Sequence, residues 1–142
     1  MEIVINKEYG GFKLSLIAIE KYLKLKGKEA HFYKMEFING KRTYRKTNKE
    51  EEVIFLYCFT KNFGKEFKDE DISNEEWDKY SFDSSDVARN DKDLVNVVKE
   101  LGEKANTRFS SLKVIQIPNN VEWIIEEYDG LEWVAEKHKT WG

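Results

Sequence analysis

The chain has 142 residues, of which 40% are hydrophobic and 14% aromatic, enough for one domain with a substantial core. Charged residues make up 36% of the chain, yet the net charge is only −3. This excludes the basic excess that is typical of proteins that bind nucleic-acid polymers. A small phosphorylated ligand remains compatible with the charge, because it requires only one or two well-placed cations.

The number of cysteines and the length of the apolar stretches indicate the cellular compartment of the protein. Cys58 is the only cysteine, so no intrachain disulfide is possible, and its apolar neighbours favour a buried, inert thiol. The N-terminal residues lack the basic and apolar regions of a secretory signal. No apolar stretch approaches the roughly 20 residues needed to cross a bilayer. The sequence therefore predicts a cytoplasmic protein with no membrane partner.

The first half of the chain reads as one helix among strands. A helix is predicted over residues 14–26, because Leu16, Ile19 and Leu23 form an apolar stripe. Ser15 is its predicted N-cap, and Gly27 ends it. The pair Asn39-Gly40 predicts a tight hairpin. The predicted strands of this half cover residues 2–5, 32–38, 42–46 and 53–59.

The second half begins with residues 60–86, for which the pattern predicts no element. A helix is predicted over 91–105 from apolar residues at the helical period, with Asn90 as its N-cap. Strands follow over 113–117 and on either side of Asp129-Gly130, and in the return strand Leu131, Trp133 and Ala135 share one face. The fold class is therefore α+β, with a largely antiparallel sheet and two main helices packed on one face.

Catalytic and metal-binding patterns are weak. His31 and His138 are the only histidines, and Cys58 lies between Tyr57 and Phe59, which disfavours a Cys–His pair. The sequence has neither a nucleophile elbow nor a phosphate-binding glycine loop. The acidic residues 69–71 favour a solvated loop over a loosely bound cation. We therefore expect that the protein is not an enzyme and binds neither a cofactor nor a metal ion.

Three short segments remain as candidate ligand contacts. Residues 9–12 place Gly10 and Gly11 before a helix, where backbone N–H groups attract anions. The spacing alone favours the alternative, a simple turn in which Phe12 belongs to the core. Residues 89–91 combine an arginine with an amide, and the alternative there is an N-cap beside an exposed arginine. Residues 106–109 join a polar pair to Arg108 and an aromatic ring.

Longer stretches resemble a known family. They run from Val4-Ile5-Asn6-Lys7 to Gly10-Gly11-Phe12-x-Leu14-Ser15. They continue with Arg89-Asn90-Asp91 and the predicted second helix as far as Asn106. They end with Val114-Ile115-x-Ile117-Pro118-x-x-Val121-Glu122-Trp123 and Glu126-Glu127-Tyr128-Asp129-Gly130-x-Glu132-Trp133-Val134-Ala135-Glu136-Lys137-His138. In these residues the chain resembles the first type of Thoeris anti-defence proteins, which are phage-encoded nucleotide sponges. The resemblance covers about two thirds of the chain and excludes roughly residues 41–80.

The resemblance implies that residues 1–142 form a single ligand-binding domain that sequesters a cyclic ADP-ribose isomer, an immune signal made by a TIR-domain protein, without degrading it. It also implies a homo-oligomer, either a dimer or larger. A nucleotide-degrading enzyme and a phage protein–protein interaction domain remain alternatives. In the implied site, Phe12 and Phe82 stack on the base, Arg89 and Arg108 contact phosphate, and Asn90 binds ribose or phosphate. Gly10, Gly11 and Thr107 add backbone and hydroxyl contacts.

Overall fold

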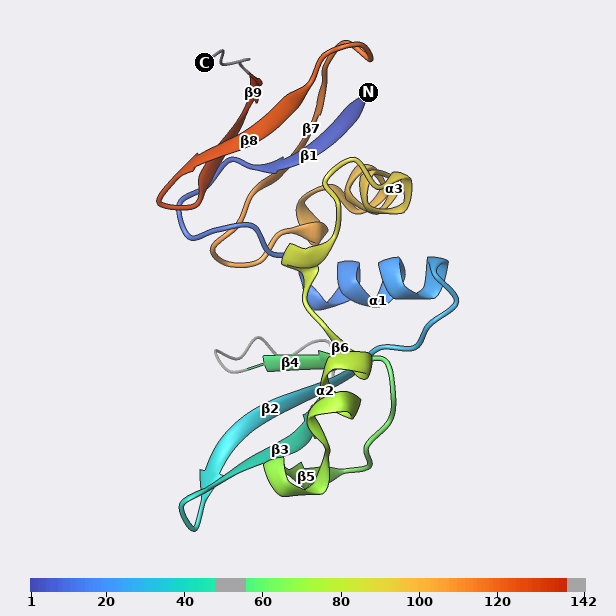
Figure 1. The fold of residues 1–142 in the computed structure, drawn as a ribbon, viewed down its shortest axis with the longest axis vertical. Helices are drawn as coiled ribbons and strands as arrows, with labels where there is room; N and C mark the ends of the chain where they lie inside the picture. The colour runs from blue at the N-terminus through green and yellow to red at the C-terminus, as the bar shows by residue number, and fades with distance from the viewer. Residues whose placement is uncertain (48–55, 138–142) are drawn as a thin grey trace, which may run out of the picture. The chain divides into compact units, whose positions relative to one another are not determined.

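The computed structural model describes residues 1–47 and 56–137 (Figure 1). The chain divides into two compact units. The first combines Met1–Ala18 with Ser84–Gly142, and the second comprises Ile19–Asp83. Helix α1 (Leu16–Leu25) contributes residues to both units. Whether both units together make one ligand-binding domain stays a prediction.

The first unit pairs the first strand of the chain with a strand from its last third. Strand β1 (Glu2–Asn6) pairs antiparallel with β7 (Leu112–Gln116), and Ile3 lies opposite Ile115. Helix α3 (Lys92–Leu101) contacts both strands, as its wide apolar stripe requires. Ile3, Val4, Leu94 and Val97 are each fully buried. These apolar faces form the core of the unit.

The ends of α3 differ in detail from the prediction. Asp91, not Asn90, is the N-cap, and its side chain accepts hydrogen bonds from the backbone N–H groups of Asp93 and Leu94. The prediction for Asn90 was wrong, because a carboxylate one position later serves the same donors and also suits the helix dipole. The predicted end at Ala105 holds only as a 3₁₀ turn, Gly102–Ala105.

A second antiparallel pair belongs to the same unit. Strands β8 (Trp123–Tyr128) and β9 (Leu131–Glu136) form a hairpin, in which Asp129 and Gly130 have φ values of 49° and 88°. Two consecutive left-handed residues are what a tight two-residue hairpin turn needs, as predicted. The alternation in β9 buries an unexpected side, since Glu132 is 5% exposed and Trp133 is 41% exposed.

The second unit is a five-stranded antiparallel sheet with the strand order β5-β3-β2-β4-β6. Its strands are β2 (His31–Ile38), β3 (Lys41–Thr47), β4 (Leu56–Phe59), β5 (Glu66–Lys68) and β6 (Ser81–Phe82). Tyr33, Tyr44, Phe59 and Phe67 form its buried cluster, with Trp77 packed against them. Aromatic rings therefore make this core, as the composition suggests.

Residues 60–86 contain structure that the sequence pattern did not predict. They form β5, a 3₁₀ turn over Asp69–Asp71, helix α2 (Asn74–Tyr80), strand β6 and a second 3₁₀ turn over Ser84–Asp86. Helix α2 begins at a clear cap, because the hydroxyl of Ser73 accepts a hydrogen bond from Glu76 N–H. The helix has only seven residues and no fully buried side chain. It is therefore too short to show an apolar period.

The α+β class and the antiparallel pairing are confirmed. Within the described ranges, the strands divide among three sheets, and there are three α-helices where two main helices were predicted. Part of the strand predicted over 53–59 falls on residues 53–55, which lie outside the described residues. None of the helices in residues 1–47 and 56–137 has both the length and the apolarity required to traverse a bilayer.

Candidate ligand-binding site

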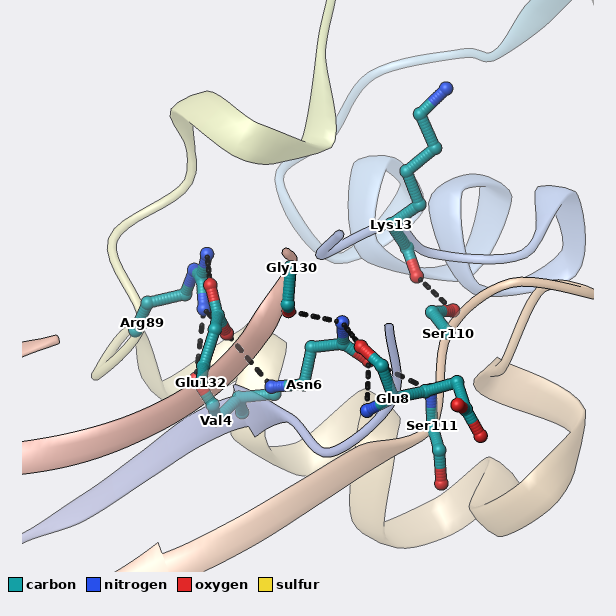
Figure 2. Close-up of polar contacts among 9 residues, drawn as sticks. All are labelled: Val4, Asn6, Glu8, Lys13, Arg89, Ser110, Ser111, Gly130 and Glu132. Carbon is teal, nitrogen blue, oxygen red and sulfur yellow. Dashed lines mark hydrogen bonds and ion pairs between the residues drawn. The ribbon is translucent and has the colours of Figure 1, made fainter. Parts of the chain in front are cut away.

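Asn6 joins three loops of the first unit at the end of β1 (Figure 2). Its fully buried side chain donates from Nδ2 to the carbonyls of Glu8, at 2.7 Å, and Gly130, at 2.8 Å. Its Oδ1 accepts from Ser111 N at 2.9 Å and from Glu8 N at 3.3 Å. An amide side chain offers two donor hydrogens and two acceptor lone pairs, so Asn6 is fully satisfied. We name the joined loops, residues 7–13, 106–111 and 129–131, the loop cluster.

Glycines let the backbones of the loop cluster approach closely. A Cβ atom at Gly130 would lie 2.1 Å from Gly11 N, and one at Gly10 would lie 2.8 Å from the carbonyl oxygen of Phe109. Gly10 N also donates to the carbonyl of Asp129 at 3.0 Å. Gly10 and Gly11 were predicted to offer backbone contacts to a ligand. In the structure they contact the other two loops, and the Gly10 N–H has a protein partner.

Ser110 connects the same loops a second time. Its hydroxyl donates to the carbonyl of Lys13 at 2.9 Å and accepts from Thr107 N at 2.9 Å. The Thr107 hydroxyl lies 2.9 Å from Ser110 Oγ, so the predicted hydroxyl contact is engaged locally. Beside these residues is a hollow of about 400 Å³. It is lined by Gly102, Glu103, Asn106, Thr107, Ser110, Ser111, Leu112 and Lys113.

Arg89 lies between a carboxylate and an aromatic ring (Figure 2 shows the carboxylate). Its guanidinium binds Glu132 through two bonds of 2.6 and 2.8 Å, and its Nη1 is 3.4 Å from the carbonyl oxygen of Val4. The Glu132 carboxylate also accepts from Asn6 N at 2.8 Å. The guanidinium carbon is 3.6 Å from the ring centroid of Phe12, which is buried. The bidentate pair joins β9 to the segment before α3, and the bond from Asn6 N joins Glu132 to β1.

These contacts bear on the roles predicted for Arg89 and Phe12. The predicted phosphate contact of Arg89 requires the guanidinium to leave Glu132, and both side chains are largely buried. The predicted stacking of a base on Phe12 requires a ring that Arg89 already covers. In the structure the two residues therefore contact each other, and Arg89 packs on the part of the loop cluster that contains Phe12.

The remaining predicted residues lie at different places. Arg108 is exposed in the loop cluster next to Phe109, which is 63% exposed. Asn90 is exposed, and its Nδ2 is 4.0 Å from Met1 Sδ. Phe82 is in β6 of the second unit, where its ring centroid is 5.9 Å from that of Tyr22. The structure thus brings Gly10, Gly11, Thr107 and Arg108 together and leaves Asn90 and Phe82 outside the loop cluster.

Cys58 and His31, which the sequence disfavours as a catalytic pair, both lie in the second unit. Burial raises the pKa of the Cys58 thiol to about 12, and a hydrogen bond with the His31 backbone only partly opposes this rise. The His31 ring lies 3.0 Å from Glu29 Oε2. A neutral thiol with such a pKa is a poor nucleophile at pH 7. His138 lies outside the described residues.

The acidic segment of residues 69–71 is engaged with its own neighbours. Asp71 Oδ2 accepts from Lys68 N at 2.8 Å, and Glu70 pairs with Lys41 at 3.3 Å. Across the part of the chain that the structure describes, no group of three or more His, Cys, Asp or Glu side chains is placed to hold a metal ion.

Sequence reasoning missed Asn6 and Glu132, which organise the site. Each stands among apolar strand residues, Asn6 after Ile3-Val4-Ile5 and Glu132 beside Leu131. A polar residue at the buried end of a strand needs a partner, because burying an unpaired amide or carboxylate is costly. That requirement is the sequence signal, but it does not say which residue supplies the partner. Apart from Glu8, the partners of these two residues are 43 to 126 positions away along the chain.

No protein-family model matches this chain, and neither a curated protein nor a solved structure matches it. Function must therefore be argued from the residues, their geometry and the resemblance described from the sequence.

Proposed function

We propose that the protein is a phage anti-defence protein that binds a cyclic ADP-ribose isomer and sequesters it without degrading it. The ligand is the TIR-derived signal, and its site is the loop cluster of the first unit. The protein acts in the cytoplasm of the host cell as a homo-oligomer.

The observation that supports this proposal is the way the two units divide the sequence. The stretches that carry the resemblance, within residues 4–15, 89–106 and 114–137, all fall in the first unit. Residues 41–80, which the resemblance does not cover, all fall in the second. A set of motifs that comes together in one compact unit is what a shared ligand-binding module would produce.

The loop cluster also offers suitable chemistry for such a ligand. Arg108 is an exposed guanidinium, which suits a pyrophosphate. Tyr9 and Phe109 are 57% and 63% exposed, and flat rings of this kind stack on adenine. Asn106 and Thr107 line the adjacent hollow. We assign the Asn106 amide to ribose hydroxyls, because the Thr107 hydroxyl already bonds Ser110. We assign Arg89 a positioning role through Glu132.

The first experiment separates sequestration from degradation. The purified protein is incubated with a cyclic ADP-ribose isomer, and the nucleotide is measured by mass spectrometry before and after heat denaturation of the protein. Recovery of the intact cyclic nucleotide after heating is expected. Opened or hydrolysed product would instead favour the enzyme alternative, and failure to bind any cyclic nucleotide would contradict the proposal.

The second experiment locates the site. Arg108→Ala is expected to weaken nucleotide binding by ~1.5 to 3 kcal/mol, the range for a hydrogen bond to a charged group. Arg42→Ala, which removes an exposed arginine from β3 of the second unit, is the matched control and is expected to leave binding unchanged. Titration calorimetry gives both affinities. If the two variants bind the nucleotide with equal affinity, the ligand does not bind at the loop cluster.

The residues predicted from sequence but lying elsewhere are tested separately. The site predicted from sequence requires Arg89→Ala and Asn90→Ala each to weaken binding by ~1 to 3 kcal/mol, and Phe82→Ala tests the predicted stacking. A site confined to the loop cluster instead leaves the affinities of the Asn90 and Phe82 variants unchanged. Because Arg89→Ala also breaks the pair with Glu132, its affinity is measured below its own unfolding temperature. Asn90→Ala and Phe82→Ala variants that bind like the original protein would restrict the site to the loop cluster.

A further inference from the structure

The β8–β9 hairpin has two unlike faces. One face packs inward, where Glu132 contacts Arg89 and β1. The other face carries three large side chains with substantial exposure: Ile124 at 39%, Tyr128 at 67% and Trp133 at 41%. The pairs Ile124↔Ala135, Glu126↔Trp133 and Tyr128↔Leu131 place all three on the same side of the ladder. We call this the outer hairpin face.

Trp133 is held in place at the centre of this face. Its indole Nε1 donates to Glu126 Oε2 on the facing strand at 2.9 Å. Ile124 and Tyr128 are its diagonal neighbours across the hairpin, a separation that large side chains span. A fixed, half-exposed indole loses little side-chain freedom on binding, so it has the properties of an interface anchor.

The charge around the outer hairpin face has one sign. Between residues 119 and 137 every charged residue except Lys137 is acidic. Of the exposed carboxylates of this segment, Glu126 is on the same side of the ladder as Trp133, and Glu122 and Asp129 flank the strands. The register places Glu127 and Glu136 on the Glu132 side of the hairpin. An indole face beside a carboxylate attracts a lysine or arginine side chain, first by cation–π contact and then by ion pairing.

The same charge decides against other occupants. A second copy of the hairpin placed face to face would set carboxylates against carboxylates, and juxtaposed like charges disfavour association. Nucleic acid and anionic lipid surfaces are repelled for the same reason. A partner with both apolar and cationic side chains would contact the exposed apolar residues and also pair with the carboxylates.

We propose that the outer hairpin face docks a basic protein segment that also bears apolar side chains, with Trp133 as its anchor. This inference is independent of nucleotide sequestration, since it uses a different side of the hairpin from the one held by Glu132. The partner's arginine or lysine side chains lie over Trp133 and meet the surrounding carboxylates. Its apolar side chains cover Ile124 and Tyr128.

The probe is a fluorescein-labelled ten-residue peptide of alternating arginine and leucine, and binding to the full chain is followed by fluorescence anisotropy. Peptides of alternating glutamate and leucine and of alternating arginine and serine are the comparisons. The arginine–leucine peptide is expected to bind most tightly and to weaken as salt rises. Equal binding of the glutamate–leucine peptide would overturn the proposal.

Matched variants assign the binding to this face. Trp133→Ser is expected to lower the affinity for the arginine–leucine peptide about tenfold or more, because the substitution removes the anchor side chain. Phe37→Ser, which removes an aromatic residue that is 66% exposed on β2, is the control and is expected to change nothing. Ile124→Ser repeats the test with a smaller side chain if Trp133→Ser lowers the melting temperature. Equal affinities of the Phe37 variant and both face variants would overturn the proposal.

Charge and self-association are tested in the same way. Glu126→Gln removes the charge that lies on the same side of the ladder as Trp133 and keeps an oxygen that can accept from the indole. It is expected to weaken peptide binding more than Glu75→Gln, which alters an exposed carboxylate on α2. Sedimentation velocity then compares Trp133→Ser with the original protein. A smaller assembly in the variant would show that a second copy covers this face, and the proposal of a basic partner would be wrong.

Discussion

The Glu132 carboxylate connects three segments of the first unit: its own strand β9, strand β1 and the segment before α3. It accepts two bonds from Arg89 and one from Asn6 N, and its side chain is only 7% exposed. Removing one partner of a buried ion pair leaves the other charge without compensation. We expect Glu132→Ala to lower the free energy of unfolding by about 3 kcal/mol, measured by urea denaturation.

The control for this prediction stands on the same strand. Glu136→Ala removes an exposed carboxylate from β9 and is expected to change stability by no more than about 0.5 kcal/mol. The double variant Arg89→Met with Glu132→Leu should recover part of the loss, since well-packed apolar residues can replace a buried pair. Similar stability of the two single glutamate variants would show that the pair contributes little.

Cys58 gives a prediction about reactivity and alkaline pH. Burial raises its pKa from 9.0 to about 12, so between these values the unfolded chain ionises at this thiol and the folded chain does not. The stabilising contribution is complete below pH 9 and is lost as the pH rises toward 12. A thiol reagent at pH 8 is expected to label the native protein far more slowly than the urea-unfolded protein. Rapid labelling of the native protein would contradict the buried placement of Cys58.

At the scale of elements, two hairpins with the same turn chemistry make a matched pair. Gly40 and Gly130 both have a positive φ, at 75° and 88°, in turns closed by Asn39-Gly40 and Asp129-Gly130. A Cβ at Gly40 meets nothing within 4 Å, whereas one at Gly130 would overlap Gly11 N at 2.1 Å. We expect Gly40→Ala to destabilise by about 1 kcal/mol through backbone conformation alone. Gly130→Ala should destabilise by clearly more, because the loop cluster must open.

Thermal unfolding of the two glycine variants distinguishes these contributions. If Gly130→Ala lowers the melting temperature no more than Gly40→Ala, the close backbone contact between the turn and Gly11 is not needed. If it lowers the melting temperature more and also weakens nucleotide binding, the hairpin turn supports the site as well as the fold.

Elements with local signals were predictable from sequence, and elements that depend on distant partners were not. Both hairpin turns and the cap of α1 by Ser15, whose hydroxyl accepts from Ala18 N at 3.2 Å, follow from turn and cap chemistry. The buried side of β9 did not follow. Alternation shows that two faces exist, but the inward placement of Glu132 depends on Arg89, which is 43 positions away.

The candidate site shows the same limit. Gly10, Gly11, Thr107 and Arg108 were selected from local composition, and the structure gathers them in the loop cluster. Their gathering depends on the Asn6 amide, whose partners at Gly130 and Ser111 lie more than 100 positions away. No spacing rule connects such residues, so the composition of the site was partly predictable and its geometry was not.

For the whole molecule, the division into two units predicts where a ligand changes local stability. A nucleotide bound at the loop cluster stabilises the segments it contacts and slows their amide exchange with solvent. Adding a cyclic ADP-ribose isomer is therefore expected to slow hydrogen–deuterium exchange in residues 7–13, 106–111 and 129–131. Exchange in β2, β3 and β5 of the second unit is expected to stay unchanged, and mass spectrometry of proteolytic fragments reports both units in one experiment. The Arg108→Ala variant at the same nucleotide concentration is the control and should lose most of the protection. Slower exchange confined to the second unit would place the ligand there and would contradict the loop cluster as its site.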